Sequence, residues 1–223
     1  VRTSVRIKRI IVENGAAKGV ELIDGTEIRA NRGVVSTIDT HQTFLKLVGE
    51  DNLTKDFVEK IKMWQWEKWS LFDVHMALEE APNFSAAASN PDINKAFVYV
   101  LGFETSEELK KQWDAMSDGE LLDPSAFNCC FPTIHDPSQG PPGRHTGLLS
   151  QMAPYKLKEG AETWLRIKYK EEQAEKLRAT LEKYAPNMTK DKVLFQYISS
   201  PADIENKFPN MVQGSIKQGA YHP

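Results

Sequence analysis

The stretch "IIVENGAAKGVELIDGTEIRANRGVVSTID", residues 10–39, decides the fold of the first part of the chain. Short apolar runs in and around it are separated by Asn14-Gly15 and Asp24-Gly25, dipeptides that favour tight hairpin turns because they tolerate positive φ angles. The last run, Gly33 to Thr37, is short and apolar, which is typical of a strand buried on both faces. The pattern therefore predicts a β-meander with strands at residues 5–12, 19–23, 27–30 and 33–37.

Composition narrows the class of protein. The chain has 223 residues, of which 40% are hydrophobic and 26% are charged, as in an ordinary soluble globular protein. A net charge of −3 gives no basic surface for nucleic acid. No apolar run reaches the roughly 20 residues that cross a bilayer, and no secretion signal is recognisable. We therefore expect no nucleic-acid partner, no transmembrane segment and, by default, a cytoplasmic location, although a targeting signal could lie upstream of the chain.

Beyond the meander, strands and helices alternate. The run Phe72 to Leu78 alternates apolar and polar residues and predicts a strand with one face in a core. Residues 95–103 predict a second long strand, and three more strands are predicted at residues 125–134, 145–155 and 192–200. Helices are predicted at residues 39–49, 52–64, 104–116, 161–184 and 200–208. The predicted N-caps are Asp39 or Thr40, Thr54, Thr105 or Ser106, and Ser200. The order predicts an α+β fold, in which one mixed β-sheet is covered by helices and preceded by the meander.

Motifs for metal binding, nucleophilic catalysis and phosphate binding are absent from the sequence. The histidines form no H-x-x-x-H or H-E-x-x-H set, and neither G-x-S-x-G nor G-x-G occurs. Cys129 and Cys130 are adjacent, so a strand would direct them to opposite faces and keep them reduced. Trp64, Trp66 and Trp69 either line a groove for a flat apolar ligand or pack between helix and sheet.

His75 is the most informative titratable residue. It shares the polar face of its predicted strand with Asp73 and Glu79, opposite an apolar face. A pocket role and a plain surface or hydrogen-bonded strand histidine both fit this position. The motifs alone therefore identify no catalytic residue, and His75 is the one candidate.

Several segments together resemble a known family. "GVVSTID" (residues 33–39) matches a V-V-S-x-x-D strand, and "HMALEEAPNF" (75–84), "DPSQGPPGRH" (136–145) and "SSPADIENKF" (199–208) follow in the family's order. The set resembles phytoene dehydrogenase-like flavoproteins, which are two-domain FAD-dependent oxidoreductases related to amine oxidases. Within them the chain is most similar to the pyridine-nucleotide-disulfide-oxidoreductase-domain-2-like group.

The resemblance implies roles for particular residues. Residues 1–40 would be the β-meander and strand of a partial FAD-binding domain, and residues 41–223 a substrate-binding domain. Val5 (through its backbone), Ser36 and Thr37 would then lie close to FAD. The residues expected to line the substrate pocket are His75, Phe97, Tyr99 and Leu101. The family's G-x-G-x-x-G turn and its C-terminal glycine-rich segment are not in this sequence. The resemblance therefore implies an internal portion of a flavoenzyme, with FAD in the parent and none bound to this chain.

The implied function is oxidation of an apolar or amine substrate by hydride transfer to flavin, with the isolated chain inactive. The expected partners are an apolar small molecule and a second copy of the chain, joined through exposed apolar surface. The alternative is a stand-alone, non-enzymatic module that uses its sheet and tryptophans to bind a lipid or a protein.

Overall fold

The computed structural model describes residues 1–123 and 125–220 and separates them into two compact units. The first unit contains residues 1–67 with 210–212 and the residues from 217 on, and the second contains residues 68–209 and 213–216. The compact units divide after Glu67. The predicted boundary at residue 40, which concerns the domains of the parent protein, stays a prediction.

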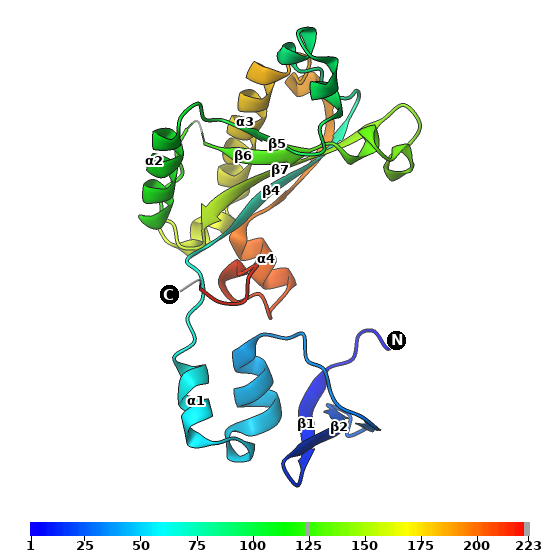
Figure 1. The fold of residues 1–223 in the computed structure, drawn as a ribbon, viewed down its shortest axis with the longest axis vertical. Helices are drawn as coiled ribbons and strands as arrows, with labels where there is room; N and C mark the ends of the chain where they lie inside the picture. The colour runs from blue at the N-terminus through cyan, green and yellow to red at the C-terminus, as the bar shows by residue number, and fades with distance from the viewer. Residues whose placement is uncertain (124, 221–223) are drawn as a thin grey trace. The chain divides into compact units, whose positions relative to one another are not determined.

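The first unit opens on the predicted meander (Figure 1). Three antiparallel strands lie in the order β1 (Ile7–Glu13), β2 (Ala16–Leu22) and β3 (Glu27–Arg29). Asn14 and Gly15 have φ angles of 53° and 73°. Both values lie in the left-handed region that the hairpin turn requires, so the sequence-based prediction of the first hairpin is confirmed.

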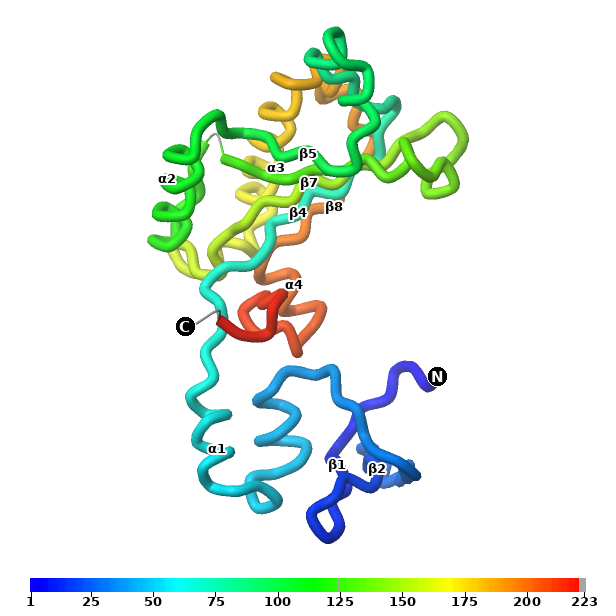
Figure 2. The backbone as a smooth tube through the Cα atoms, viewed as in Figure 1, coloured from blue at the N-terminus to red at the C-terminus, as the bar shows by residue number. Residues whose placement is uncertain are grey.

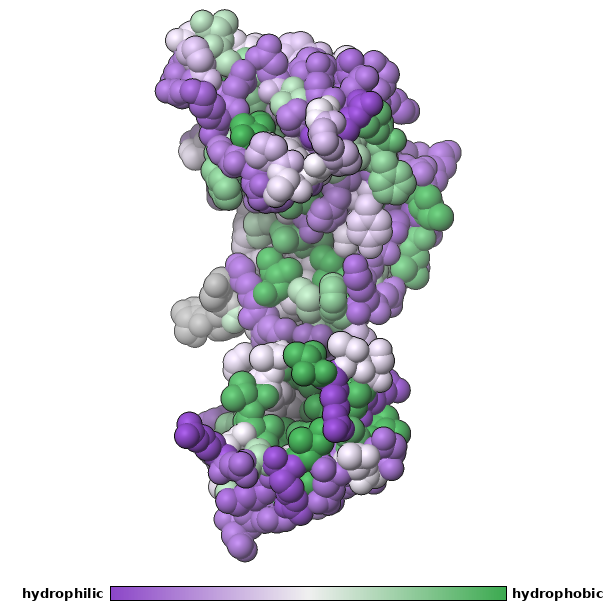
Figure 3. Space-filling model, turned by 90° about the vertical axis from the view of Figure 1, so that its right-hand side faces the viewer, coloured by the Kyte–Doolittle hydropathy of each residue, from purple (hydrophilic) through white to green (hydrophobic). Residues whose placement is uncertain are grey.

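The fourth predicted strand, residues 33–37, does not form in this structure. No described strand pairs with this segment, and the Val35 side chain is 90% exposed. A strand needs a neighbour for its backbone hydrogen bonds, and the described residues supply none here. The prediction of a strand buried on both faces is therefore wrong for this structure. Figure 3 shows further apolar surface on the first unit, among charged side chains. The exposed large apolar side chains of this unit include Val5, Ile7, Ile23, Ile28 and Met63.

Two longer helices follow in the first unit, a π-helix η1 (His41–Gly49) and α1 (Lys55–Lys62). The Asp39 carboxylate accepts a hydrogen bond from the backbone N–H of Gln42 at 3.0 Å, and the Thr54 hydroxyl accepts one from the third residue of α1. Both side chains satisfy N–H groups that the first turn of a helix leaves unpaired, which confirms the predicted caps.

The second unit is built on a five-stranded sheet in the order β5-β6-β7-β4-β8. Every neighbouring pair is antiparallel, so the α+β class is confirmed, while the strand directions are antiparallel rather than mixed. Figure 2 shows that β4 and β8, distant in sequence, run side by side. The strands are β4 (Trp69–Leu78), β5 (Tyr99–Leu101), β6 (Phe127–Cys130), β7 (His145–Pro154) and β8 (Val193–Ser199).

Strand β5 is much shorter than the strand predicted at residues 95–103. A 3₁₀ helix, η4 (Pro91–Lys95), occupies the chain just before it. Gly102, with φ of 95°, ends the strand where a Cβ atom would lie 2.3 Å from the backbone oxygen of Ser125. The prediction from apolar content made this strand too long, because the turns on either side override the β-strand preference of its residues.

One face of the sheet, the core face, is fully packed. Phe72, Val74, Met76 and Leu78 of β4 point into it, as predicted from their alternation. The helix α3 (Ile167–Tyr184) lies across this face (Figure 1) and contributes Ala174, Leu177 and Leu181 to the same cluster. Trp164, just before α3, stacks on Phe72 with ring centres 5.5 Å apart.

Two further α-helices of the second unit begin as the sequence predicts. Thr105 caps α2 (Ser106–Ser117) and Ser200 caps α4 (Pro201–Lys207), each in a reciprocal capping box. The remaining short helices are 3₁₀: η2 (Glu50–Asn52), η3 (Ser85–Ala88), η5 (Pro132–Ile134), η6 (Pro137–Gln139), η7 (Ala161–Leu165), η8 (Lys190–Lys192) and η9 (Val212–Gly214). Within the described residues, no helix has the length and apolar character needed to cross a membrane.

Candidate functional site

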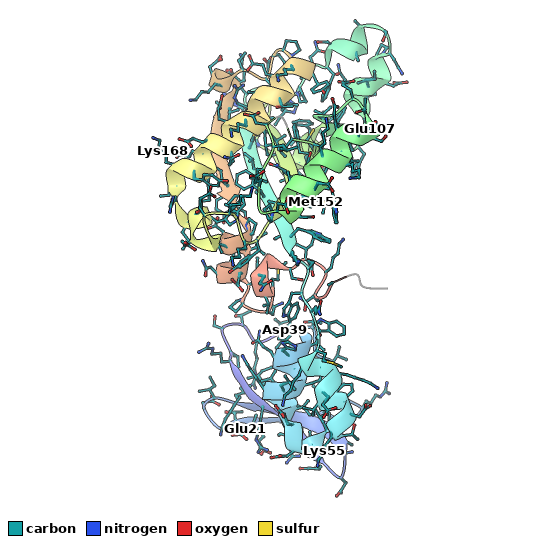
Figure 4. All side chains as sticks on the ribbon, turned by 90° about the vertical axis from the view of Figure 1, so that its left-hand side faces the viewer. Glu21, Asp39, Lys55, Glu107, Met152 and Lys168 are labelled. Carbon is teal, nitrogen blue, oxygen red and sulfur yellow. The ribbon has the colours of Figure 1, made fainter. Side chains whose placement is uncertain are left out.

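The face of the five-stranded sheet opposite α3, the open face, is the candidate site. In Figure 1 α3 lies behind the sheet, and on the open face α2 covers only one end, where Trp69 meets Trp113 at 4.6 Å between ring centres. Figure 4 shows Met152 of β7 at this end, beside α2. The strand registers place on the open face Leu71, Asp73 and His75 of β4, Val100 of β5, Asn128 and Cys130 of β6, Leu148, Ser150 and Met152 of β7, and Phe195, Tyr197 and Ser199 of β8.

A carboxylate–hydroxyl pair lies at the centre of the open face. The hydroxyl of Ser150 donates to Oδ1 of Asp73 at 2.5 Å, across the β4–β7 register. Burial raises the pKa of the Asp73 carboxyl above its usual value, and the Ser150 hydrogen bond and the charge of His75 oppose this shift. Asp73 is thus a partly desolvated acceptor held in place by a neighbouring strand.

His75 and Tyr197 lie beside this pair. His75 is exposed, faces the same side as Asp73, and pairs in register with Tyr197 of β8. The two ring centres are 5.9 Å apart, and the Lys207 ammonium group of α4 lies 5.9 Å from the centre of the Tyr197 ring. The polar centre therefore includes a carboxylate, a hydroxyl, an imidazole and a phenol within one part of the sheet.

Apolar side chains surround the polar centre. Val100 is 61% exposed, Phe195 69% and Met152 37%, and Leu148 is half-buried. Large apolar side chains are uncommon in this density on a face that meets only water. The open face therefore offers apolar contact around a small hydrogen-bonding centre, which is the usual make-up of a small-molecule site.

The structure does not bring together all four residues expected to line a pocket. Tyr99 lies on the core face, where its ring stacks on Phe84 at 4.1 Å between centres. Leu101 also packs against the core, and Phe97 lies before β5 with its ring 5.4 Å from that of His135. Because side chains alternate along a strand, Val100 faces the side opposite to Tyr99 and Leu101. The alternation could therefore have indicated Val100 as a residue of the open face. The Asp73–Ser150 pair joins residues 77 positions apart and had no signal in the sequence.

The two cysteines separate as predicted. Cys129 is buried in the core, where burial raises the pKa of its thiol to about 12. Cys130 is half-buried on the open face, and burial raises the pKa of its thiol as well. Both are free thiols. Because side chains alternate along a strand, the strand directs one thiol to each face. Groups of three or more histidine, cysteine or acidic side chains that could hold a metal do not occur in the described part.

The three tryptophans belong to different parts of the molecule. Trp69 packs between β4 and α2 of the second unit, which is the helix–sheet role considered above. In the first unit, Trp64 donates from its indole nitrogen to the backbone oxygen of Gln218 at 2.8 Å, and Trp66 contacts His41. The three do not form one groove within either unit.

The residues expected near FAD all lie in the first unit. Val5 and Thr37 are exposed. Ser36 borders a cavity of about 320 Å³, and its hydroxyl is 2.7 Å from that of Thr43. The other residues around this cavity are mostly apolar: Ile10, Ala17, Val34, Ile38, Thr40, Thr43, Phe44 and Val48.

Comparison with known proteins supports the resemblance inferred from the motifs. The chain is 32% identical to a limonene dehydrogenase subunit of Castellaniella defragrans over 227 aligned residues, which cover 96% of this chain and 40% of that protein. It is 31% identical to pyridine nucleotide-disulfide oxidoreductase domain-containing protein 2 of Mus musculus, over 92% of this chain and 35% of that protein. One of these relatives is named as a dehydrogenase subunit and the other for an oxidoreductase domain, and the chain is similar to a part of each. It spans less than half the length of these two relatives.

A comparison with solved structures concerns the fold of the chain. A putrescine oxidase variant redesigned in its cofactor binding matches 90% of this chain and 35% of its own, with a TM-score of 0.50 and 11% identity. A likeness at this identity shows the fold alone, and it agrees with the α+β arrangement described above. No protein-family model matches the chain.

The first unit by itself supplies few groups that fit FAD. Ser36 offers one hydroxyl at the cavity edge. Residues 33–37 offer backbone N–H and C=O groups that pair with no described strand. A dinucleotide also needs a cradle of backbone N–H groups for its pyrophosphate, usually in a glycine-rich turn before a helix. The glycine spacing of such a turn is missing from the sequence. That Val5, Ser36 and Thr37 lie close to FAD therefore stays a prediction.

Proposed function

We propose that this chain forms the substrate-facing part of a FAD-dependent oxidoreductase, and that the open face binds the substrate. The observation that carries the proposal is the Asp73–Ser150 pair at the centre of an exposed sheet face with an apolar border. The relationship to oxidoreductases supplies the reaction class. The parent would oxidise an apolar or amine substrate by hydride transfer to flavin.

The chain's own residues would bind and orient the substrate. The apolar border holds the body of the substrate and excludes water from it, while Asp73 and Ser150 fix its orientation. His75, exposed beside them, is the residue best placed to take up a proton at a ring nitrogen. Bound FAD would supply the acceptor for the two electrons that the substrate loses as hydride.

A largely apolar substrate agrees with one relative's name. The limonene dehydrogenase of Castellaniella defragrans is named for limonene, which is a hydrocarbon. Val100, Phe195 and Met152 expose apolar surface suited to a ligand of this kind. We carry over the apolar character of the substrate, and not its identity.

The proposal also predicts which form of the protein binds flavin, the 223-residue chain or the full-length protein. The purified 223-residue chain is expected to bind FAD weakly or not at all and to be inactive, because it lacks the glycine-rich phosphate cradle. The full-length protein is expected to carry flavin that an apolar substrate bleaches under anaerobic conditions. The visible absorption band of oxidised flavin measures both.

Either of two results would contradict the proposal. A stoichiometric yellow flavin on the purified chain would refute the predicted inactivity of the isolated chain. A full-length protein without flavin would refute the oxidoreductase function and favour a stand-alone lipid- or protein-binding module. A homodimer through exposed apolar surface stays a prediction that sedimentation of the same samples tests.

A further inference from the structure

The Asp73 carboxylate has hydrogen-bonding capacity left over. Oδ1 accepts from Ser150, a hydroxyl on a residue that is only 7% exposed. Oδ2 accepts no hydrogen bond from the described residues. An ionised carboxylate has about four acceptor sites, so this group can take a further donor without losing its present partner. Oδ2 is not one of the fully buried side-chain atoms that lack a partner in the described residues, so it remains accessible to a donor group of a ligand.

No basic side chain neutralises this carboxylate. Within the described residues, neither lysine nor arginine forms an ion pair with Asp73, and His75 is the titratable side chain that acts on it. The residues that face Asp73 from the adjacent strands are Ser150 on β7 and Ser199 on β8. On α4, Lys207 lies over the Tyr197 ring. The centre of the open face therefore presents acceptors and a negative charge within an apolar border.

We propose that Asp73, oriented by Ser150, binds the amino or hydroxyl group of an otherwise apolar substrate. The substrate class is then an amphipathic small molecule with one hydrogen-bond donor, rather than a plain hydrocarbon. This inference rests on the proposed function for the place where substrate binds, and it adds the chemical class. Hydrogen bonds to a charged group are about twice as strong as neutral ones, so the donor decides the orientation of the ligand.

A ligand without a donor is disfavoured because it would cover the carboxylate and leave it unpaired. Sites built to hydrogen-bond a polar group discriminate strongly against analogues that lack the group. For one charged hydrogen bond, we expect a difference of roughly ten- to a hundredfold in affinity.

The test uses three ligands with one carbon skeleton: methylcyclohexane, cyclohexylmethanol and cyclohexylmethylamine. Dissociation constants with the full-length protein are measured by NMR, following the Met152 methyl signal on the open face. The amine, or the amine and the alcohol, should bind at least about tenfold more tightly than the hydrocarbon. Asp73→Asn should abolish this preference and leave the hydrocarbon affinity unchanged.

Glu79→Gln is the matched control. Glu79 follows directly after β4, and its carboxylate is already paired with Lys192 at 2.9 Å. This change removes a carboxylate without touching the polar centre, so it should leave all three affinities unchanged. Ser150→Ala provides a second route should Asp73→Asn fail to fold, and it should reduce the preference for the donor ligands.

Two outcomes overturn the inference. One is equal affinity for the three ligands in the wild-type protein, and the other is a loss of the same size for all three in Asp73→Asn. The measurement is binding without turnover, so it is independent of flavin reduction. A full-length protein that oxidises a hydrocarbon and shows no preference for a donor keeps the proposed function and refutes the amphipathic substrate class.

Discussion

The two faces of the five-stranded sheet are made by the same strands and yet have opposite character. Leu149 is fully buried on the core face, and its neighbour Leu148 is half-buried on the open face. Cys129 and Cys130 divide in the same way, and so do Val74 and its two polar neighbours in β4. Because side chains alternate along a strand, every second residue packs in the core and stabilises the fold, while the residues between them are available for binding.

The largest expected effect is on stability. Leu149→Ala should lower the free energy of unfolding by about 3 kcal/mol, because it leaves a cavity in a close-packed core. Leu148→Ala, the same change one residue earlier, should cost less than about 1 kcal/mol, as substitutions near a surface do. Urea denaturation of both variants measures the difference. Equal losses would mean that the open face is packed as tightly as the core face in the folded protein.

The next effect concerns thiol reactivity. Cys130 should react with iodoacetamide roughly tenfold or more faster than Cys129, because the core thiol is buried and its pKa is raised to about 12. Mass spectrometry after timed quenching reports the two rates, and in denaturant the rates should become similar. If Cys129 were modified faster than Cys130, the core thiol would be more accessible to the reagent than the thiol on the open face, which contradicts the structure.

Much of the fold was predictable because its signals are local. The Asn14-Gly15 turn and the caps at Thr54, Thr105 and Ser200 each depend on a few consecutive residues, and all four are present as predicted. The apolar alternation of β4 likewise needed no information from the rest of the chain.

The parts that failed depend on distant partners. Residues 33–37 have the composition of a buried strand, but a strand forms only where another supplies hydrogen bonds. For the candidate site, the sequence indicated His75 and the polar face around Asp73. It could not indicate Ser150, which reaches Asp73 only through the β4–β7 register. It also grouped Tyr99 with His75, although the sheet places them on opposite faces.

The smallest expected effect is the dependence of stability on pH, and two carboxylates near β4 should show opposite signs. Burial raises the pKa of Asp73 in the folded protein above its unfolded value of 3.8. Ionisation then costs more in the folded state, so wild-type stability falls as the pH rises from 3.8 through the folded pKa. Asp73→Asn removes this dependence, and the variant should gain stability relative to wild type over the same rise in pH.

Glu79 should behave in the opposite way, because the hydrogen bond and charge of Lys192 hold the pKa of its carboxyl below the usual value of 4.5. Its contribution is present above pH 4.5 and is lost as the pH falls through the folded pKa. Glu79→Gln should therefore lose stability relative to wild type as the pH rises, most clearly at low salt, where surface ion pairs are least screened. Thermal unfolding of wild type and both variants across acidic to neutral pH gives the two signs. If both variants shift in the same direction, Asp73 is not the desolvated carboxylate of the open face. The contrast between a solvent-exposed ion pair just after β4 and a binding centre on β4 then fails.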